Sequence, residues 1–170
     1  MASAYFLDTS ALLPRFLKRA SGHKWVESIC DPHRQNVIAI AEITATDIAS
    51  ALNQLVRGGT LHKKPCDESL SLFWSQVENN QYVLLPISSV IVRRAANLCS
   101  VRPLKGMDAL QLACALMLRD DVRLARAMSA DTGGVAFEDP IFLTEDHKLR
   151  DAAVAEGFVV DTPLSHITQS

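Results

Sequence analysis

Short runs of apolar residues, bounded by polar or turn-forming residues, recur along the 170-residue chain. Runs of this length that are rich in branched and aromatic side chains are typical of buried strands. The first run, from Tyr5, stops at Asp8 and is followed by two hydroxyl residues, so it predicts a strand with a carboxylate at its C-terminal end. The other runs predict strands at residues 37–40, 82–86, 141–144 and 158–160.

Between these runs, apolar residues recur at the spacing of one helix face. This pattern predicts a buried central helix at residues 104–118, which are apolar almost all the way round. Because strands and helices alternate, we expect an α/β fold with a mostly parallel central sheet. Three other helices are predicted at residues 42–56, 67–78 and 147–156. A further helix is predicted to begin at Ser10, a short one to contain Trp25, and another to follow a cap at Ser88 or Ser89.

We expect a single domain over residues 1–170, because the chain has an ordinary domain length and contains no repeat or linker-like segment. Residues 119–140 are polar and contain glycine. We interpret this segment as an insertion or lid, with a short helix at residues 122–128.

Composition narrows the class of protein. Hydrophobic residues make up 48% of the chain, which argues against disorder, and no apolar run approaches the ~20 residues that span a bilayer. Because Asp8 interrupts the first apolar run and no basic region precedes it, we find no signal peptide and expect a cytoplasmic protein. The net charge of -2 argues against binding through a broad basic surface. The four cysteines are far apart and form no CxxC pair, so we expect free thiols.

Four aspartates stand where predicted elements begin or end. Asp8 and Asp146 follow strands, whereas Asp47 and Asp108 lie near the starts of helices. In an open parallel sheet such positions can converge beyond the C-terminal ends of the strands, where ligands bind. Asp108 also stands at the head of the almost wholly apolar helix, where an ionised carboxylate requires a partner or a metal.

Each acid alone also has a structural explanation. Asp8 and Asp146 can cap the helices that follow them, and Asp108 favours a helix N-terminus. Asp47 has the spacing of a capping box with Thr44. Four carboxylates gathered at one edge, however, would repel one another strongly without cations. An oxygen-only set suits Mg²⁺ or Mn²⁺ rather than zinc, and such ions promote phosphodiester hydrolysis.

Four stretches, in this order, resemble the PIN-domain family and more closely the VapC toxins of bacterial toxin–antitoxin pairs: YFLDTSAL (5–12), DIASAL (47–52), MDALQLA (107–113) and FLTEDHKL (142–149). The resemblance covers nearly the whole chain. It implies a three-layer α/β/α domain and an endoribonuclease that requires Mg²⁺ or Mn²⁺, cleaves RNA and is held inactive by a cognate antitoxin. We also expect a homodimer.

The resemblance makes Asp8, Asp108 and Asp146 candidate catalytic residues and metal ligands. The remaining acidic position of the family, usually Glu before an Ala-Leu pair, is Asp47 in this chain. Because aspartate is one methylene shorter, Asp47 would reach the metal only through water, and Glu42 is the alternative for this position.

Hydroxyl residues accompany the acids in the sequence. Thr9, Ser10 and Thr144 would orient the carboxylates or metal-bound water, or alternatively cap helices. Glu145, beside Asp146, is a further candidate for the site.

Two other functions compete with this interpretation. A PIN-like module that is weakly active or inactive and acts by binding RNA or a protein is favoured by the shorter acid at Asp47. A haloacid-dehalogenase-like phosphatase also begins with an acid after a strand, but it requires a second Asp two residues later, where Ser10 stands. A purely structural domain leaves Asp108 unexplained.

Overall fold

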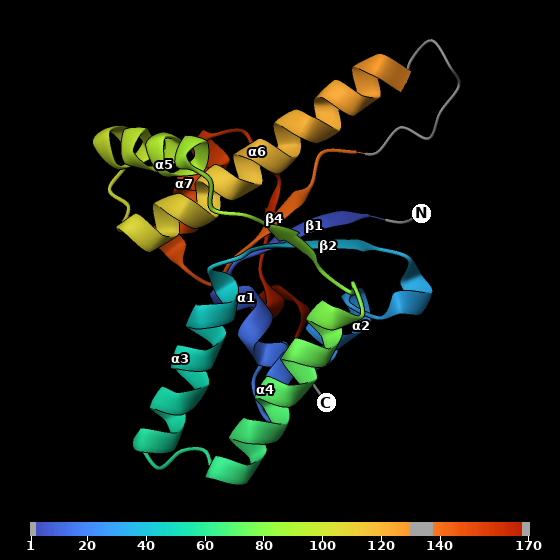
Figure 1. Cartoon of the computed structure of the whole chain (residues 1–170), viewed down its shortest axis with the longest axis vertical. Coiled ribbons are helices and arrows are strands. Elements are labelled where there is room, and N and C mark those ends of the chain that lie inside the picture. The colour runs from blue at the N-terminus through green and yellow to red at the C-terminus, as the bar shows by residue number, and fades with distance from the viewer. Residues whose placement is uncertain (1–2, 130–137, 168–170) are drawn as a thin grey trace.

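A parallel sheet of five strands, in the order β3-β2-β1-β4-β5, forms the centre of the molecule (Figure 1). The computed structural model describes residues 3–129 and 138–167. Every pairing between neighbouring strands is parallel, so the C-terminal ends of all strands meet at one edge. The strands are β1 (Ala4–Leu7), β2 (Val37–Ala41), β3 (Val83–Leu85), β4 (Ile141–Leu143) and β5 (Val160–Asp161).

Helices cover both faces of this sheet (Figure 1). Successive residues of β1 face opposite layers: Phe6 packs with α5, α6 and α7, whereas Leu7 packs with α1 to α4. The three-layer α/β/α fold implied by the sequence resemblance is therefore confirmed. The helices are α1 (Thr9–Leu12), α2 (His23–Ile29), α3 (Thr44–Arg57), α4 (Lys63–Glu78), α5 (Ser89–Val101), α6 (Gly106–Ser129) and α7 (His147–Ala155).

The central strand β1 places its C-terminal end in the middle of the edge. Phe6 and Leu7 are fully buried because helices cover the strand on both sides. The backbone N–H of Asp8 donates to the carbonyl oxygen of Leu143 at 3.1 Å, so the ends of β1 and β4 are joined. The first acid of the sequence is thus fixed where the two strands stop.

The predicted end of the buried helix at residue 118 is wrong, because α6 continues to Ser129. Its last turns lie beyond the apolar core, where the sequence pattern is polar, and Figure 1 shows this end of α6 projecting past the sheet. Residues 119–129 of the predicted insertion are therefore helix. Residues 130–137 lie outside the described residues.

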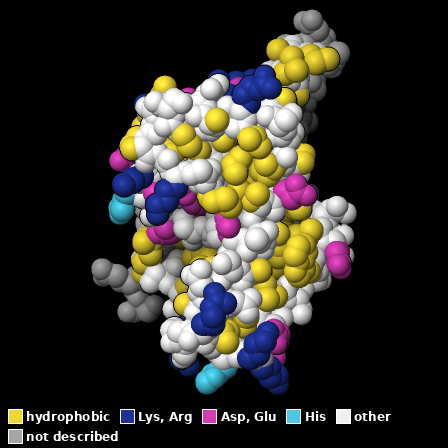
Figure 2. Space-filling view, turned by 60° about the vertical axis from the view of Figure 1, so that its left-hand side comes forward, with side chains coloured by type: hydrophobic (Ala, Val, Ile, Leu, Met, Phe, Trp, Pro, Cys, Tyr) yellow, Lys and Arg dark blue, Asp and Glu magenta, His cyan; other side chains and the backbone are white. Residues whose placement is uncertain are grey.

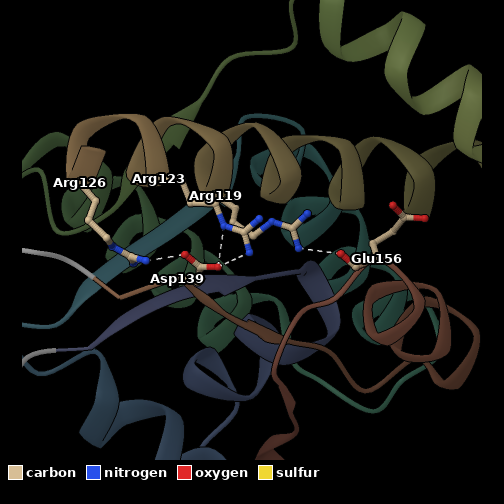
Figure 3. Close-up of polar contacts among 5 residues, drawn as sticks. All are labelled: Arg119, Arg123, Arg126, Asp139 and Glu156. Atoms are coloured by element: carbon tan, nitrogen blue, oxygen red, sulfur yellow. Dashed lines mark hydrogen bonds and ion pairs between the residues drawn. The ribbon is translucent and has the colours of Figure 1, made fainter. Parts of the chain in front are cut away.

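Arginines along one side of α6 fasten its outer half (Figure 3). Arg119 donates to the backbone oxygen of Glu156 at 2.7 Å, and its guanidinium lies 4.4 Å from the ring centroid of Phe158. Arg123 and Arg126 both form ion pairs with Asp139, just before β4. The helix is thus tied to the segments that enter β4 and β5, which explains why a polar sequence remains helical here.

Most other element boundaries shift by one or two residues from the sequence prediction, and three of the differences follow here. The helix predicted after Ser10 stops early, because α1 ends at Leu12 and a 3-10 turn that contains Pro14 follows. α4 begins at Lys63, before the predicted residue 67. The last strand contains Val160 and Asp161 rather than residues 158–160.

The described residues contain no helix long and apolar enough to cross a membrane. All four cysteines are free, and Cys99 is exposed whereas Cys30, Cys66 and Cys114 are buried.

Candidate active site

Asp8 lies directly after β1 and is only 5% exposed. Its carboxylate caps α1 by accepting a hydrogen bond from the Ala11 N–H at 2.8 Å. The Ser10 hydroxyl donates to the same carboxylate at 2.8 Å, and Thr144 Oγ1 donates to its other oxygen, Oδ2, at 2.8 Å. Three groups, two from α1 and one from the end of β4, therefore fix this acid in one orientation.

Burial raises the pKa of Asp8 to about 6. The hydrogen bonds from Ala11, Ser10 and Thr144 lower this pKa but do not cancel the effect of burial, and the negative charge of Asp108 raises it further. A carboxyl group with this pKa loses its proton readily when a cation lies nearby. Asp8 is therefore an acid whose surroundings favour a positive partner.

The β4–α7 loop, residues 144–146, joins Asp8 to a second acid. Thr144 is fully buried, and its hydroxyl donates to Asp8 while it accepts a hydrogen bond from the Asp146 N–H at 3.0 Å. The Ser10 hydroxyl in turn accepts from the Glu145 N–H at 2.8 Å. The predicted role of Ser10 and Thr144 as orienting hydroxyls is consistent with these contacts.

Asp146 is exposed and caps α7 by accepting a hydrogen bond from the Leu149 N–H at 2.8 Å. The capping role considered from the sequence is thus observed. It leaves the other carboxylate oxygen for a different partner, because the cap bond uses Oδ1 alone.

Asp47 extends from the first turn of α3 toward α1. The Thr9 hydroxyl donates to Asp47 Oδ2 at 3.2 Å. Burial raises the pKa of Asp47, and the hydrogen bond from Thr9 partly opposes this effect. Glu42, the alternative for this position, is exposed and accepts a 3.4 Å hydrogen bond from the Ile87 N–H, on the side of β3.

The capping box considered for Asp47 and Thr44 is wrong. Ile43 occupies the N-cap position of α3, and its side chain makes no capping hydrogen bond. Thr44 is the first residue of the helix and is fully buried. The Thr44 hydroxyl lies 3.1 Å from Gln111 Nε2, which donates to it. Asp47 is therefore free of this structural role.

Gln111 is a residue of the site that the sequence interpretation missed. It is buried in α6, and its Nε2 donates to Thr44 at 3.1 Å and to Thr9 at 3.4 Å. It therefore links α6 to α1 and α3 and supports the hydroxyl that holds Asp47. The available signal was a polar residue one turn after Asp108 in an otherwise apolar helix.

Asp108 lies in the first turn of α6 and is half-buried. The pKa of Asp108 is raised, and burial is the largest cause. The negative charges of Asp146 and Asp47 raise this pKa further, whereas a backbone hydrogen bond from Lys105 and the positive charge of Lys105 lower it. The charge of Asp108 thus interacts with those of Asp146 and Asp47, and it also interacts with the charge of Asp8. The acid most in need of a partner, however, is the deeply buried Asp8 rather than Asp108.

The type of donor at this edge fits a hard divalent cation, because carboxylates and hydroxyls supply oxygen ligands. Figure 2 turns the C-terminal edge of the sheet toward the viewer and shows acidic side chains across the middle of this face, with hydrophobic side chains above and below. Among the described residues, no three Asp, Glu, His or Cys side chains already stand as a ready-made metal-ligand group. The charges of these acids therefore affect one another, but the acids do not form a compact group of three metal ligands.

Among the solved structures with similar folds are three that each match 94% of this chain. VapBC2 from Rickettsia felis, bound to a promoter DNA fragment, has a TM-score of 0.56 at 13% identity and is covered over 98% of its chain. PAE2754 from Pyrobaculum aerophilum has a TM-score of 0.55 at 20% identity and 85% coverage. FitAcB from Neisseria gonorrhoeae has a TM-score of 0.54 at 14% identity and 97% coverage.

No protein-family model matches the sequence, and neither does any curated protein. The structural likeness at these identities concerns the fold, which extends over 85% to 98% of the length of the three similar chains. The chain therefore has a PIN-like three-layer α/β/α fold, as its resemblance to VapC proteins predicted.

Proposed function

We propose that this protein is a divalent-metal-dependent endoribonuclease of the VapC toxin type. The observation that carries the proposal is the buried carboxylate of Asp8, which two hydroxyls orient at the same sheet edge as three other acids. A buried acid with a raised pKa and neighbouring acids points to a functional site. The PIN-like fold and the four sequence stretches support the reaction class.

Asp8 and Asp108 would hold the principal Mg²⁺ ion, which Mn²⁺ can replace, and Asp47 and Asp146 would complete the site. When bound, the ion supplies an activated water and neutralises charge that develops on the phosphodiester. Asp8 is the anchor because it alone is deeply buried among the described acids.

The surrounding polar residues keep the acids in place before substrate arrives. Ser10 and Thr144 hold Asp8, and Thr9 holds Asp47 while Gln111 supports Thr9. Hydrogen bonds of this kind to metal-binding carboxylates commonly change metal affinity or activity by about 10-fold to 100-fold when removed. The chain thus restricts its acids to orientations that favour one cation site.

A toxin of this type requires a protein that restrains it. The first similar structure is VapBC2 bound to promoter DNA, which supports a toxin–antitoxin context for this chain. We therefore propose a cognate antitoxin as partner, and RNA as substrate. A homodimer is also proposed, and sedimentation of the purified protein tests it.

The direct test is cleavage of total RNA by purified protein. Wild type with Mg²⁺ should cleave, and EDTA should stop cleavage. Asp108→Asn should lower the rate by at least about 100-fold, because a neutral amide replaces a charged oxygen ligand. Asp121→Asn, an exposed acid on the same helix, is the matched control and should cleave like wild type. Cleavage that survives EDTA or Asp108→Asn contradicts the proposal.

A PIN-like module without catalysis is the second candidate. It is favoured by the shorter acid Asp47, whose carboxylate already binds Thr9, and by the lack of a ready-made three-ligand group among the described residues. This candidate predicts RNA or protein binding without cleavage, with equal binding by wild type and Asp108→Asn.

A further inference from the structure

A short segment after β5 packs beside the candidate site. It is a 3-10 turn, Pro163–His166, whose last residue stacks on Trp25 of α2 with ring centroids 4.0 Å apart and planes 1° apart. His166 Nε2 also lies 2.8 Å from Asp161 Oδ2 at the end of β5. We call residues 162–166 the clasp, because they hold α2 and β5 together.

The start of the clasp fits closely against the turn before α2. Pro163 is buried, and it lies against Gly22, whose φ is +80°. A Cβ atom at residue 22 would lie 2.6 Å from Pro163 Cβ, so glycine is required both by the backbone conformation and by the contact. The position of the clasp is therefore built into the fold at two points, Pro163 and His166.

The clasp also contacts the β4–α7 loop of the candidate site. The Leu164 N–H donates to Glu145 Oε1 at 3.2 Å and, at the longer distance of 3.4 Å, to Thr162 Oγ1. The backbone N–H of Glu145 donates a hydrogen bond to Ser10 Oγ at 2.8 Å. Glu145 therefore connects the clasp on one side to Ser10 on the other.

From Ser10 the connection reaches the buried acid directly. Its hydroxyl donates to both carboxylate oxygens of Asp8, at 2.8 and 3.0 Å. The residue after Glu145 is Asp146, whose N–H donates a hydrogen bond to Thr144 Oγ1. The Glu145 peptide thus lies between Ser10, which donates to Asp8, and Asp146.

We propose that Glu145 is a positioning residue for the acidic site and that the clasp holds it in place. This inference rests on the proposed nuclease function, since positioning matters only if the acids act. The Glu145 side chain accepts from Leu164 of the clasp, so it anchors the loop from the outside. Opening of the clasp would free the Glu145 peptide and loosen the hydrogen bonds that Ser10 and Thr144 make to Asp8.

Amide hydrogen exchange at Glu145 and Asp146 measures this coupling without relying on activity. Glu145→Ala removes the acceptor for Leu164, and His166→Ala removes the stack, so both should speed exchange at these two amides by at least about 5-fold. Glu145→Gln keeps an acceptor oxygen, and His166→Phe keeps a stacking ring although it loses the contact with Asp161, as His166→Ala does. Both conservative variants should therefore exchange like wild type.

RNA cleavage by the same variants tests positioning. Glu145→Ala and His166→Ala should lower kcat by about 10-fold with the KM for RNA within about two-fold of wild type, because positioning groups affect the oriented acids more than substrate binding. The conservative variants Glu145→Gln and His166→Phe should instead have a kcat close to that of wild type. Glu68→Ala, an exposed glutamate on α4, is the matched control and should match wild type in both measurements.

Trp25 fluorescence reports the stack itself. The chain has two tryptophans, Trp25 and Trp74, so Trp74→Phe leaves Trp25 as the single emitter. In this background His166→Ala should change Trp25 emission, which confirms that the stack is lost.

The outcomes separate this inference from the proposed function. Unchanged exchange at Glu145 and Asp146 when Trp25 emission shows that the stack is lost overturns the coupling. Faster exchange with an unchanged kcat overturns the positioning role. If wild type itself does not cleave RNA, the proposed function fails, and exchange at the two amides still decides whether the clasp holds the loop.

Discussion

Replacement of Asp8 by asparagine should stabilise the metal-free protein while it abolishes activity. The ionised carboxylate of Asp8 is 5% exposed, so at neutral pH the fold contains a buried charge. The asparagine side chain has nearly the same shape, and its oxygen would still accept from the Ala11 N–H. Its amide would donate to Ser10 or Thr144, because hydroxyls can reverse their hydrogen-bond direction.

The size of the effect follows from the pKa of Asp8. Burial raises this pKa from 3.8 to about 6, and each pKa unit corresponds to about 1.4 kcal/mol, so ionisation in the fold costs about 3 kcal/mol. A raised pKa means that the folded state binds the proton more tightly than the unfolded state. The stability contributed by Asp8 is therefore fully present below its unfolded pKa of 3.8 and is lost as the pH rises through about 6.

Urea unfolding followed by circular dichroism, in EDTA, measures this difference. The free energy of unfolding of Asp8→Asn minus that of wild type should rise by about 2 to 3 kcal/mol between about pH 4 and about pH 7.5. Asp121→Asn, an exposed acid, should show no such rise. Excess Mg²⁺ should then stabilise wild type but not Asp8→Asn, because only a bound cation compensates the charge.

A stability of Asp8→Asn that lies below that of wild type by a constant amount at every pH would refute this prediction. That result would mean that the hydrogen bonds from Ser10, Thr144 and Ala11 outweigh the cost of burial. The raised pKa of Asp8 would then be absent.

Three further predictions concern the support of the site and the fold. Thr144→Val removes the donor to Asp8 and should lower the rate of RNA cleavage by about 10-fold to 100-fold, whereas Thr144→Ser should retain most of it; equal rates would contradict the orienting role. Leu112→Ala, at a fully buried position of α6, should cost about 2–5 kcal/mol in urea unfolding, and a cost below about 1 kcal/mol would contradict close packing there. Asp139→Asn breaks partly exposed pairs with Arg123 and Arg126 and should change the free energy of unfolding by about 1 kcal/mol or less, with cleavage unchanged.

The sheet and the position of Asp8 were predictable because the signals are local. An apolar run that stops at an acid indicates both a buried strand and its end, and the strands of a parallel sheet end at a common edge. The order of the elements, and hence the α/β class, followed from the alternation of strand and helix patterns. Lengths were less certain, since α4 begins before its first strongly apolar residues.

Features that depend on distant contacts were not predictable. A short helix was predicted at residues 122–128, but the sequence did not indicate that it continues the buried helix without a break. This outer half of α6 is bound to Asp139 and to the backbone of Glu156, which come later in the chain. The capping-box spacing of Asp47 misled because Thr44 is instead buried against Gln111. Local spacing indicates what a side chain can do, whereas tertiary packing decides which partner it meets.

The contact between Glu145 and Leu164 is of the same kind. The two residues are 19 positions apart in the sequence. Leu164 belongs to none of the four stretches that resemble the PIN-domain family, and FLTEDHKL, which contains Glu145, does not indicate this contact. Only the fold places the backbone of Leu164 beside the carboxylate of Glu145.

The central claim is that the acids beside Asp8 form a divalent cation site. Equilibrium binding of Mn²⁺, followed by the electron paramagnetic resonance signal of the free ion, tests this claim without RNA. Wild type and Asp121→Asn should bind Mn²⁺ saturably and alike, whereas Asp8→Asn and Asp108→Asn should bind at least about 10-fold more weakly. Equal Mn²⁺ affinity in all four proteins, or no saturable binding by wild type, would contradict the account.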